Sequence, residues 1–216
     1  MPRTMLLSVY DKTNLVEYVR ELIKRDWKLL ASGGTAKAIT EAGLPVKDIA
    51  DIVGNPILGH RVVTLSREIH AGLLAKDTPE DRAELENLGI DWIDAVCVDL
   101  YPLLDAIKKP DATKQSIIEM TDIGGPTMLS SAAKGRRFVM SKTAELETFI
   151  KWLGAKEPNP DLLRNEMAVK ADIRVSVYRL TSALYHTQDS LEFKRLQAVY
   201  HNFTWEPFPL LFNERS

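Results

Sequence analysis

Four consecutive residues with anion-binding chemistry, Ser32-Gly33-Gly34-Thr35, stand between a short apolar run and a helix-like stretch. A strand, this turn and a helix would place free backbone N–H groups, two hydroxyls and the positive end of a helix dipole at one spot. Such a group suits a phosphate. A plain strand-to-helix turn has the same composition, so this stretch alone leaves both interpretations open.

The turn after the first apolar run has similar chemistry. Ser8, Asp11, Lys12 and Thr13 follow "MLLSVY", and Lys12 would add a mobile cation at the same sheet edge. The structural alternative is a helix cap with a solvated lysine. Two neighbouring strand ends with the same anion-friendly residues favour the phosphate interpretation more than either end does alone.

The segment "GHRVVTLSREIHAG" is rich in hydrogen-bond donors, namely Arg61, Thr64, Ser66, Arg67 and His70. An arginine can bind phosphate or carboxylate through two parallel hydrogen bonds. Asp99 and Tyr101 follow directly after another apolar run, where Tyr101-Pro102 could instead be a wedge at the strand end. Each of these residues therefore has both a functional and a structural interpretation.

The stretch "TDIGGPTMLSSAAKGR" contains Asp122, a Gly124-Gly125 turn and Lys134. A helix that begins near Pro126 places Lys134 roughly 12 Å along its axis, so its side chain would return to a pocket only through its reach or through chain bending. The alternatives are that Asp122 caps this helix and that Lys134 is a surface charge.

Three apolar runs ahead of turn residues, from Met5, Trp27 and Asp94, read as strands of a buried parallel sheet. The stretch "TNLVEYVRELIKR" between the first two has apolar residues at helical spacing, with Thr13 or Asn14 as its N-cap. The resulting β-α-β-α-β order predicts an α/β fold, an open parallel sheet flanked by helices, with binding loops at the carboxyl ends of the strands.

The clearest break in the chain is "KEPNPD", which separates an amphipathic helix at residues 143–154 from a long helical stretch. We therefore predict an α/β domain over 1–155 and a helical C-terminal segment over 156–216 that packs on it. The apolar tail "FTWEPFPLLF" could pack on its own domain or on a partner subunit.

Composition narrows the class of protein. The 28 basic and 30 acidic residues give a net charge of −2, so no global charge points to nucleic acid or to an anionic membrane. A single cysteine, Cys97, in an apolar run excludes an intramolecular disulfide and indicates a core residue. Neither a signal-peptide pattern nor an apolar run of membrane-spanning length is present, so we expect a cytoplasmic protein.

Five stretches, "SVYDKTNLVEYVREL", "LLASGGTAKAITEAGLPVKDI", "RVVTLSREIHAGLLA", "DLYPL" and "DIGGPTMLSSAAK", resemble in order and spacing the N-terminal IMP cyclohydrolase domain of the bifunctional purine-biosynthesis enzymes that also hold AICAR transformylase. The resemblance covers about residues 5 to 150. It implies a methylglyoxal-synthase-like fold, no metal or redox cofactor and a homodimer. The sequence contains no transformylase domain, which suggests a separate transformylase protein as a partner.

The implied reaction closes a ring: the carboxamide nitrogen of FAICAR attacks the formyl carbon, and loss of water gives IMP. By the same resemblance the nucleotide is bound by Ser8, Lys12, Ser32, Gly33, Gly34, Thr35, Arg61, Thr64, Asp99, Ile123 and Gly124. The implied catalytic residues are Tyr101, Asp122 and Lys134. Asp122 would take or orient the proton, while Lys134 and Tyr101 would stabilise the formyl oxygen.

The chain departs from the family at the reactive end. The family motif Arg-Val-Lys-Thr-Leu-His-Pro is matched by residues 61–67, where the lysine is Val63 and the His-Pro pair is Ser66-Arg67. An expected asparagine is Asp99. Three hypotheses follow: a working cyclohydrolase in which Arg67 or Lys134 supplies the missing cation, a nucleotide-binding module without catalysis, or a methylglyoxal-synthase-type lyase that uses His70 with Asp99 or Asp122.

Overall fold

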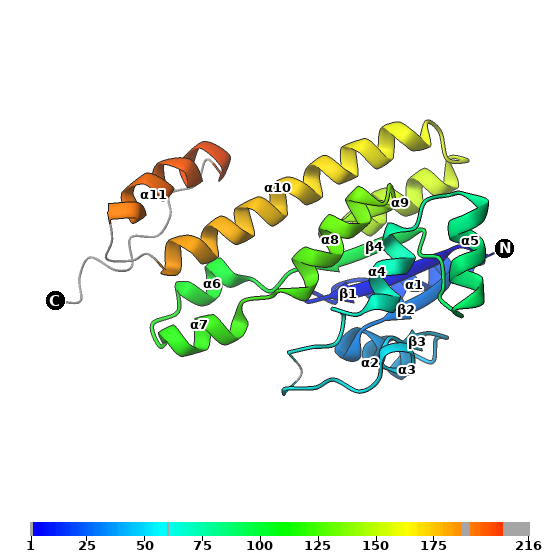
Figure 1. The fold of residues 1–216 in the computed structure, drawn as a ribbon, viewed down its shortest axis with the longest axis horizontal. Coiled ribbons are helices and arrows are strands. Elements are labelled where there is room, and N and C mark those ends of the chain that lie inside the picture. Colours follow the sequence, from blue (N-terminus) through cyan, green and yellow to red (C-terminus); the bar gives the residue numbers. More distant parts are fainter. Residues whose placement is uncertain (1, 60, 187–190, 205–216) are drawn as a thin grey trace. The chain divides into compact units, whose positions relative to one another are not determined.

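The computed structural model describes residues 2–59, 61–186 and 191–204. These residues form one parallel sheet of five strands in the order β3-β2-β1-β4-β5 (Figure 1). The strands are β1 (Thr4–Val9), β2 (Lys28–Ala31), β3 (Lys47–Asp48), β4 (Ala95–Asp99) and β5 (Phe138–Met140). The predicted parallel α/β sheet is confirmed, and the three apolar runs are β1, β2 and β4.

The register of the central strands brings the predicted site residues to one edge. In β1, Leu7 is paired with Ala31 of β2 and with Cys97 of β4. All three side chains are buried, as expected for a sheet covered on both faces. β2 ends at Ala31, and β1 and β4 each end two residues after this paired row, so polar residues that follow the strands meet at the carboxyl edge.

Helices cover both faces of this sheet. α1 (Leu15–Ile23) packs against α2 (Gly33–Glu41) and α9 (Glu145–Gly154), whereas α4 (Arg67–Leu74) packs against α8 (Gly124–Lys134). Right-handed crossovers explain the grouping, because the chain moves outward from β1 through α1 and α2 and returns to β4 and β5 through α4 and α8. The short α3 (Ala50–Val53) and α5 (Pro79–Asn87) complete the connections.

Capping residues and a glycine mark several helix ends. Thr78 caps α5 by accepting a hydrogen bond from the N–H of Asp81, and Pro79 is the first helical residue. Gly43 follows α2 with a φ of +71°. Asn14 is the N-cap residue of α1, but it has a left-handed φ of 57° and its side chain makes no capping bond.

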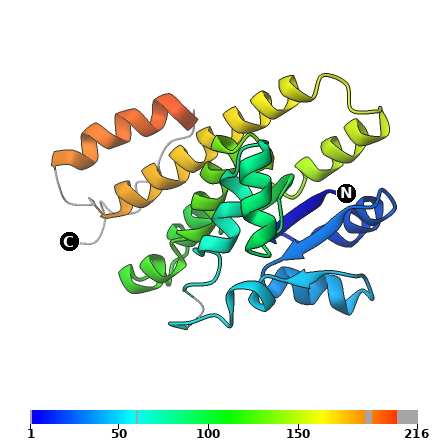
Figure 2. The same cartoon turned by 45° about the vertical axis from the view of Figure 1, so that its right-hand side comes forward.

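The chain divides into two compact units: Met1–Leu100 with Ile123–Asp172, and Tyr101–Asp122 with Ile173–Ser216. The predicted boundary near Ala155 lies between α9 and α10 (Pro160–His186), inside the first unit. Figure 2 shows α10 as one continuous ribbon. The tail from 205 to 216, for which we predicted a packing role, lies outside the described residues.

The second unit is helical where it is described. It contains α6 (Leu103–Ile107), α7 (Lys114–Met120), the C-terminal half of α10, and α11 (Leu191–Thr204). Leu184 and Tyr200 are buried at its centre, and the surrounding apolar side chains are Leu104, Val177, Leu180 and Leu196. Residues 101–122 thus share a core with helices more than 50 residues further along the chain.

No helix within the described ranges is both long enough and apolar enough to cross a membrane.

Candidate functional site

Ser8 and Ser32 come together at the carboxyl edge of the sheet. Ser32 Oγ donates a hydrogen bond to Ser8 Oγ over 2.8 Å. Ser32 is held there because its own N–H donates to the carbonyl of Leu7, which extends the β1–β2 pairing by one residue. Both side chains are half-buried, so two hydroxyls form a single polar point at the end of two adjacent strands.

The N-terminus of α2 begins beside these hydroxyls. Gly33 and Gly34 are exposed, and their backbone N–H groups have no partner among the described residues. Gly33 has a φ of +20°, which only glycine adopts without strain, and no atom lies within 4 Å of the point where a Cβ would be. Two free N–H groups at the positive end of a nine-residue helix are well suited to an anion.

Thr35 anchors this loop instead of facing it. Its side chain is buried, and its hydroxyl accepts from the N–H of Val9 (3.1 Å) and donates to the carbonyl of Val9 (3.3 Å). These bonds tie α2 to the end of β1. The predicted phosphate contact of Thr35 would require its hydroxyl to exchange partners.

Lys12 lies in the turn after β1, and its side chain is exposed. Its Nζ donates to the carbonyl oxygens of Val9 and Tyr10, each at 3.4 Å. These are long, weak bonds, and they hold the ammonium group at the end of β1. Lys12 is therefore a cation that can move toward a ligand at small cost.

Asp99 organises the same turn from the neighbouring strand. Its Oδ2 accepts from the N–H of Asp11 over 3.0 Å, and the hydroxyl of Thr143 donates to the carbonyl of Asp11. The Asp11 carboxylate accepts from Thr13, and these hydrogen bonds lower the pKa of Asp11. Asp99 thus has a structural task at the carboxyl edge in addition to its predicted substrate contact.

Residues 61–66, which precede α4, include two that differ from the family motif, Val63 and Ser66. Val62 forms an isolated antiparallel bridge with Ile57, and Val63 and Thr64 are half-buried while Arg61 is exposed. Ser66 is the N-cap of α4, where its Oγ accepts from the N–H of Ile69. Serine is a strong N-cap residue, so Ser66 has a clear structural reason to replace the family histidine.

Arg67, which could replace the missing lysine, is the first residue of α4. Its guanidinium pairs with the adjacent Glu68 (Nε to Oε1, 3.4 Å), and its side chain is three-quarters exposed. A surface pair of this kind is weak, so Arg67 keeps the freedom to bind a ligand. The ion pair with Glu68 is evidence neither for nor against a place for Arg67 in the site.

Lys134 lies at the opposite edge of the sheet from Ser8 and Ser32. α8 begins at Gly124, preceded by the half-exposed Ile123, and Lys134 is its last residue, about 15 Å along the axis. The chain then enters β5, whose first residue Phe138 is paired with Ala95 at the start of β4. Lys134 is therefore beside the amino ends of β4 and β5, whereas the serines are at the carboxyl edge.

Tight packing fixes this end of α8. A Cβ on Gly135 would stand 1.8 Å from the carbonyl oxygen of Leu73, so only glycine fits against the end of α4. Arg137 donates to the carbonyls of Gly72 and Ala75, and burial lowers the pKa of Arg137 to about 10. A bend of α8 that carried Lys134 back to the carboxyl edge would disrupt these contacts.

His70, which the lyase hypothesis requires as an acid or base, faces the interior. Its Nδ1 is 2.9 Å from the hydroxyl of Ser131 in α8, and its buried Nε2 has no hydrogen-bond partner among the described residues. Desolvation lowers the pKa of His70. This placement between α4 and α8 gives no support to a lyase role.

Tyr101 and Asp122 belong to the second unit. Tyr101 directly follows the first segment of unit 1 and is 49% exposed, while Asp122 is half-buried just before α8. The N–H of Asp122 donates to the hydroxyl of Tyr178 over 2.8 Å. Tyr178 has no local sequence signal that would mark it, because its partner is 56 positions away.

A second acidic residue at the carboxyl edge was also missed. Glu145, in the first turn of α9, accepts from the N–H of Ser141, and burial raises the pKa of its carboxyl despite that bond. Asp99 contributes to this rise.

The Cys97 thiol is fully buried, and its burial raises its pKa well above the usual value, which agrees with the predicted core role.

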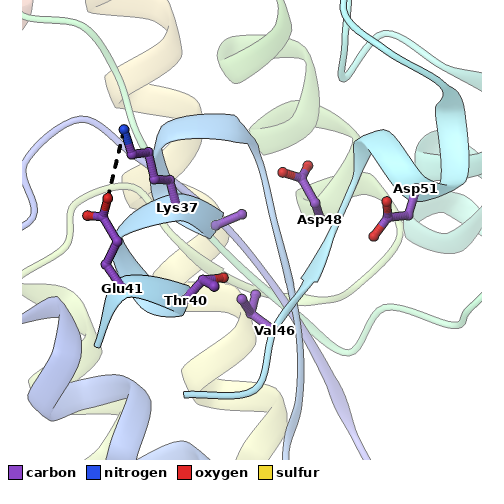
Figure 3. Close-up of a pocket in the computed structure, with 7 residues that line it drawn as sticks. Lys37, Thr40, Glu41, Val46, Asp48 and Asp51 are labelled. Atoms are coloured by element: carbon purple, nitrogen blue, oxygen red, sulfur yellow. Dashed lines mark ion pairs between the residues drawn. The ribbon is translucent and has the colours of Figure 1, made fainter. Parts of the chain in front are cut away.

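A pocket of about 320 Å³ lies elsewhere, between α2, β3 and α3 (Figure 3). In Figure 3, Lys37 reaches Glu41 (3.8 Å), and the carboxylates of Asp48 and Asp51 are on the other side of the pocket. None of the predicted site residues lines it. Its excess of carboxylates makes it a poor site for phosphate.

Across residues 2–59, 61–186 and 191–204, no cluster of three or more His, Cys, Asp or Glu side chains is suited to a metal ion.

Known proteins resemble this chain over most of its length. The family model described as MGS-like domain matches residues 14–127. The bifunctional purine biosynthesis protein PurH of Synechococcus elongatus is 40% identical over 191 residues, which cover 86% of this chain and 37% of that protein. PurH of Cyanothece sp. is 50% identical over 137 residues, or 62% of this chain and 27% of that protein.

The chain thus spans less than half the length of these curated relatives. A solved structure of more similar length also matches this chain. The crystal structure of ForH superposes with a TM-score of 0.71 at 31% identity, over 86% of this chain and 98% of ForH. The match includes more of the chain than the family model does, so it extends beyond α8 into the helices that follow.

Proposed function

The chain belongs to the MGS-like domain family, and from this premise we propose that it is an IMP cyclohydrolase, which closes the second ring of FAICAR to give IMP and water. The observation that carries the proposal is the open N-terminus of α2. One edge of the sheet holds two backbone N–H groups that have no partner in the described part of the chain, the hydrogen-bonded hydroxyls of Ser8 and Ser32, and the mobile Lys12. The chain that carries this group is similar to purine-biosynthesis proteins.

In the proposed site the nucleotide phosphate binds at Gly33 and Gly34. The phosphate carries two negative charges, so the helix dipole and the N–H groups stabilise it without a large side-chain charge. This arrangement anchors one end of the substrate. The five-membered ring at the other end of the substrate bears the carboxamide and formamide groups that react.

The chemical step needs few catalytic groups because both reacting groups are on the same molecule. The carboxamide nitrogen forms a bond to the formyl carbon and gives up one of its protons to the formyl oxygen. The formamide nitrogen gives up the second proton as the C–O bond breaks, so the oxygen leaves as water and a C=N bond completes the ring. Asp122 accepts or orients the carboxamide proton, and Tyr101 donates a hydrogen bond to the oxygen as negative charge develops on it. Lys134 has the least support as a cation here, because it is beside the amino end of β5.

The direct test mixes the purified chain with FAICAR and follows the formation of IMP. The proposal predicts turnover well above the rate in solvent, and turnover no faster than solvent would overturn it. The role of Asp122 is tested by the variant Asp122→Asn, which keeps the size and the backbone hydrogen bond of Asp122 but removes the base. We expect at least a hundredfold loss of rate in this variant.

A second function is favoured by one observation, the apolar Val63 in place of a family lysine. Loss of one electrostatic donor costs about 10²–10³ in rate, and a chain with an intact phosphate end and a weakened reactive end could serve as a nucleotide-binding module. Calorimetry with IMP and AMP distinguishes the two functions. Tight binding with no turnover of FAICAR supports the module, and absence of binding excludes it.

A further inference from the structure

Tyr178 forms an unusual pair of hydrogen bonds with the chain segment just before α8. Its side chain lies on α10 and is only 7% exposed. The phenol oxygen accepts from the N–H of Asp122 over 2.8 Å, and it donates a long, weak hydrogen bond to the carbonyl of Met120 over 3.5 Å. All three residues belong to the second unit.

These two hydrogen bonds provide partners for backbone groups that have none within a helix. α7 ends at Met120, and Thr121 already has an extended backbone with φ −73° and ψ 111°. The carbonyl of Met120 and the N–H of Asp122 therefore lack partners in the helix ladder, and such groups need a partner when they are buried. A single phenol, which is both a donor and an acceptor, satisfies the two of them.

The phenol keeps this double role over the whole working range of pH. Burial is the largest cause that raises the pKa of Tyr178 to about 12, so the hydroxyl retains its proton at neutral pH. A neutral phenol beside Asp122 also adds no charge that would compete for the carboxylate. Its effect on Asp122 is therefore geometric.

We infer that Tyr178 is a positioning residue for the proposed reaction, holding the backbone of Asp122 so that its carboxylate keeps one direction. This inference rests on the proposed function. It assigns a task to α10, which follows the region that the family model matches. A misplacement of a reacting group by about 1 Å can cost about a hundredfold in rate, so one remote hydroxyl is enough to matter.

The test is Tyr178→Phe, which removes only the hydroxyl. We expect kcat to fall tenfold to a hundredfold. The dissociation constant for IMP should change less than twofold, because the phosphate binds at α2. The control is Thr181→Val, one turn along α10, whose buried hydroxyl bonds only within the helix, to the carbonyl of Val177. This variant should keep the wild-type kcat.

Amide hydrogen exchange gives a reading that does not depend on activity. The Asp122 amide should be protected at least a hundredfold in the wild-type protein and should exchange faster in Tyr178→Phe but not in Thr181→Val. Exchange at the rate of an exposed amide in the wild-type protein would overturn the inference even if the variant failed to fold.

The outcomes separate the two proposals. A wild-type protein without turnover contradicts the proposed function, while the exchange rates still decide whether Tyr178 holds Asp122. A wild-type protein with turnover, and a folded Tyr178→Phe with unchanged kcat, contradicts the positioning role alone. Equal losses of kcat in Tyr178→Phe and Thr181→Val would also contradict it, because they would indicate a general effect of destabilising α10.

Discussion

The phosphate loop and the predicted reactive end of this molecule are built in different ways. The phosphate loop, residues 32–35 with Ser8, depends on backbone N–H groups and on short side chains fixed by the β1–β2 pairing. The residues proposed for the reactive end are single side chains instead. Val63 lies ahead of α4 in the first unit, and Tyr101 and Asp122 are the two ends of one segment of the second unit.

The two parts also differ in how a substitution affects them. Backbone groups at the end of a strand and the start of a helix are kept as long as the fold is kept, whatever the neighbouring side chains are. A side chain in a loop can change without disrupting the fold. Val63 and Ser66 both differ from the family motif, and Ser66 is also the N-cap of the helix that follows it.

The sharpest way to break the comparison is to place a negative charge in the phosphate loop. Gly34→Asp should weaken IMP binding about a hundredfold or more, because like charges cost several kcal/mol when they meet. Nothing lies within 4 Å of the point that a Cβ on Gly34 would occupy, so the side chain fits. Calorimetry measures the affinity.

The matched control is Gly34→Ala, which keeps the N–H and adds no charge. Its IMP affinity should stay within threefold of wild type, and its helix should gain up to about 1 kcal/mol because alanine is the better helix former. Equal affinities for Gly34→Asp and wild type would place the phosphate elsewhere.

The reactive end is tested by restoring the family residue. Val63→Lys should raise the turnover of FAICAR about a hundredfold or more if the missing cation limits the rate. Val63→Met, which has similar length but no charge, serves as the control and should leave the rate unchanged. An increase in neither variant would mean that position 63 does not contact the reacting groups.

Asp99→Asn, the second restoration, should have a smaller effect. An asparagine oxygen can still accept from the N–H of Asp11, so the turn should survive and kcat should change less than tenfold. Removal of the charge should lower the pKa of Glu145, although burial, its main cause, would keep it raised. NMR titration of the Glu145 carboxyl measures this shift, and a pKa that rises would contradict the account.

The smallest effect concerns the stability of α4, beside the reactive loop. Burial lowers the pKa of His70 below 6.5 in the folded state, so below pH 6.5 the unfolded chain binds the proton more readily. Stability should therefore fall as the pH decreases below 6.5. Urea unfolding at several pH values should show a smaller fall in His70→Gln than in the wild-type protein.

Much of the fold could be predicted from the sequence because its signals are local. Apolar runs before turns marked β1, β2 and β4, and a capping threonine followed by proline marked α5. The joining of Ser8 and Ser32 followed from the rule that the carboxyl ends of neighbouring parallel strands meet at one edge. The two strand-end motifs were therefore enough to predict that group of residues.

The remaining features depend on contacts between distant residues. Tyr178 bonds to Asp122 across 56 positions, and residues 101–122 join the core of the C-terminal helices, which no composition shift indicates. Thr35 resembles a ligand in sequence, but its buried hydroxyl binds Val9. The sequence already predicted that Lys134 lies roughly 12 Å along its helix, and the start of α8 at Gly124 lengthens this distance to about 15 Å.

The most direct test of the central claim is a crystal structure of the chain with IMP bound. The account predicts phosphate oxygens within hydrogen-bond distance of the N–H groups of Gly33 and Gly34 and of the Ser8 or Ser32 hydroxyl. A phosphate bound away from the N-terminus of α2 would contradict it.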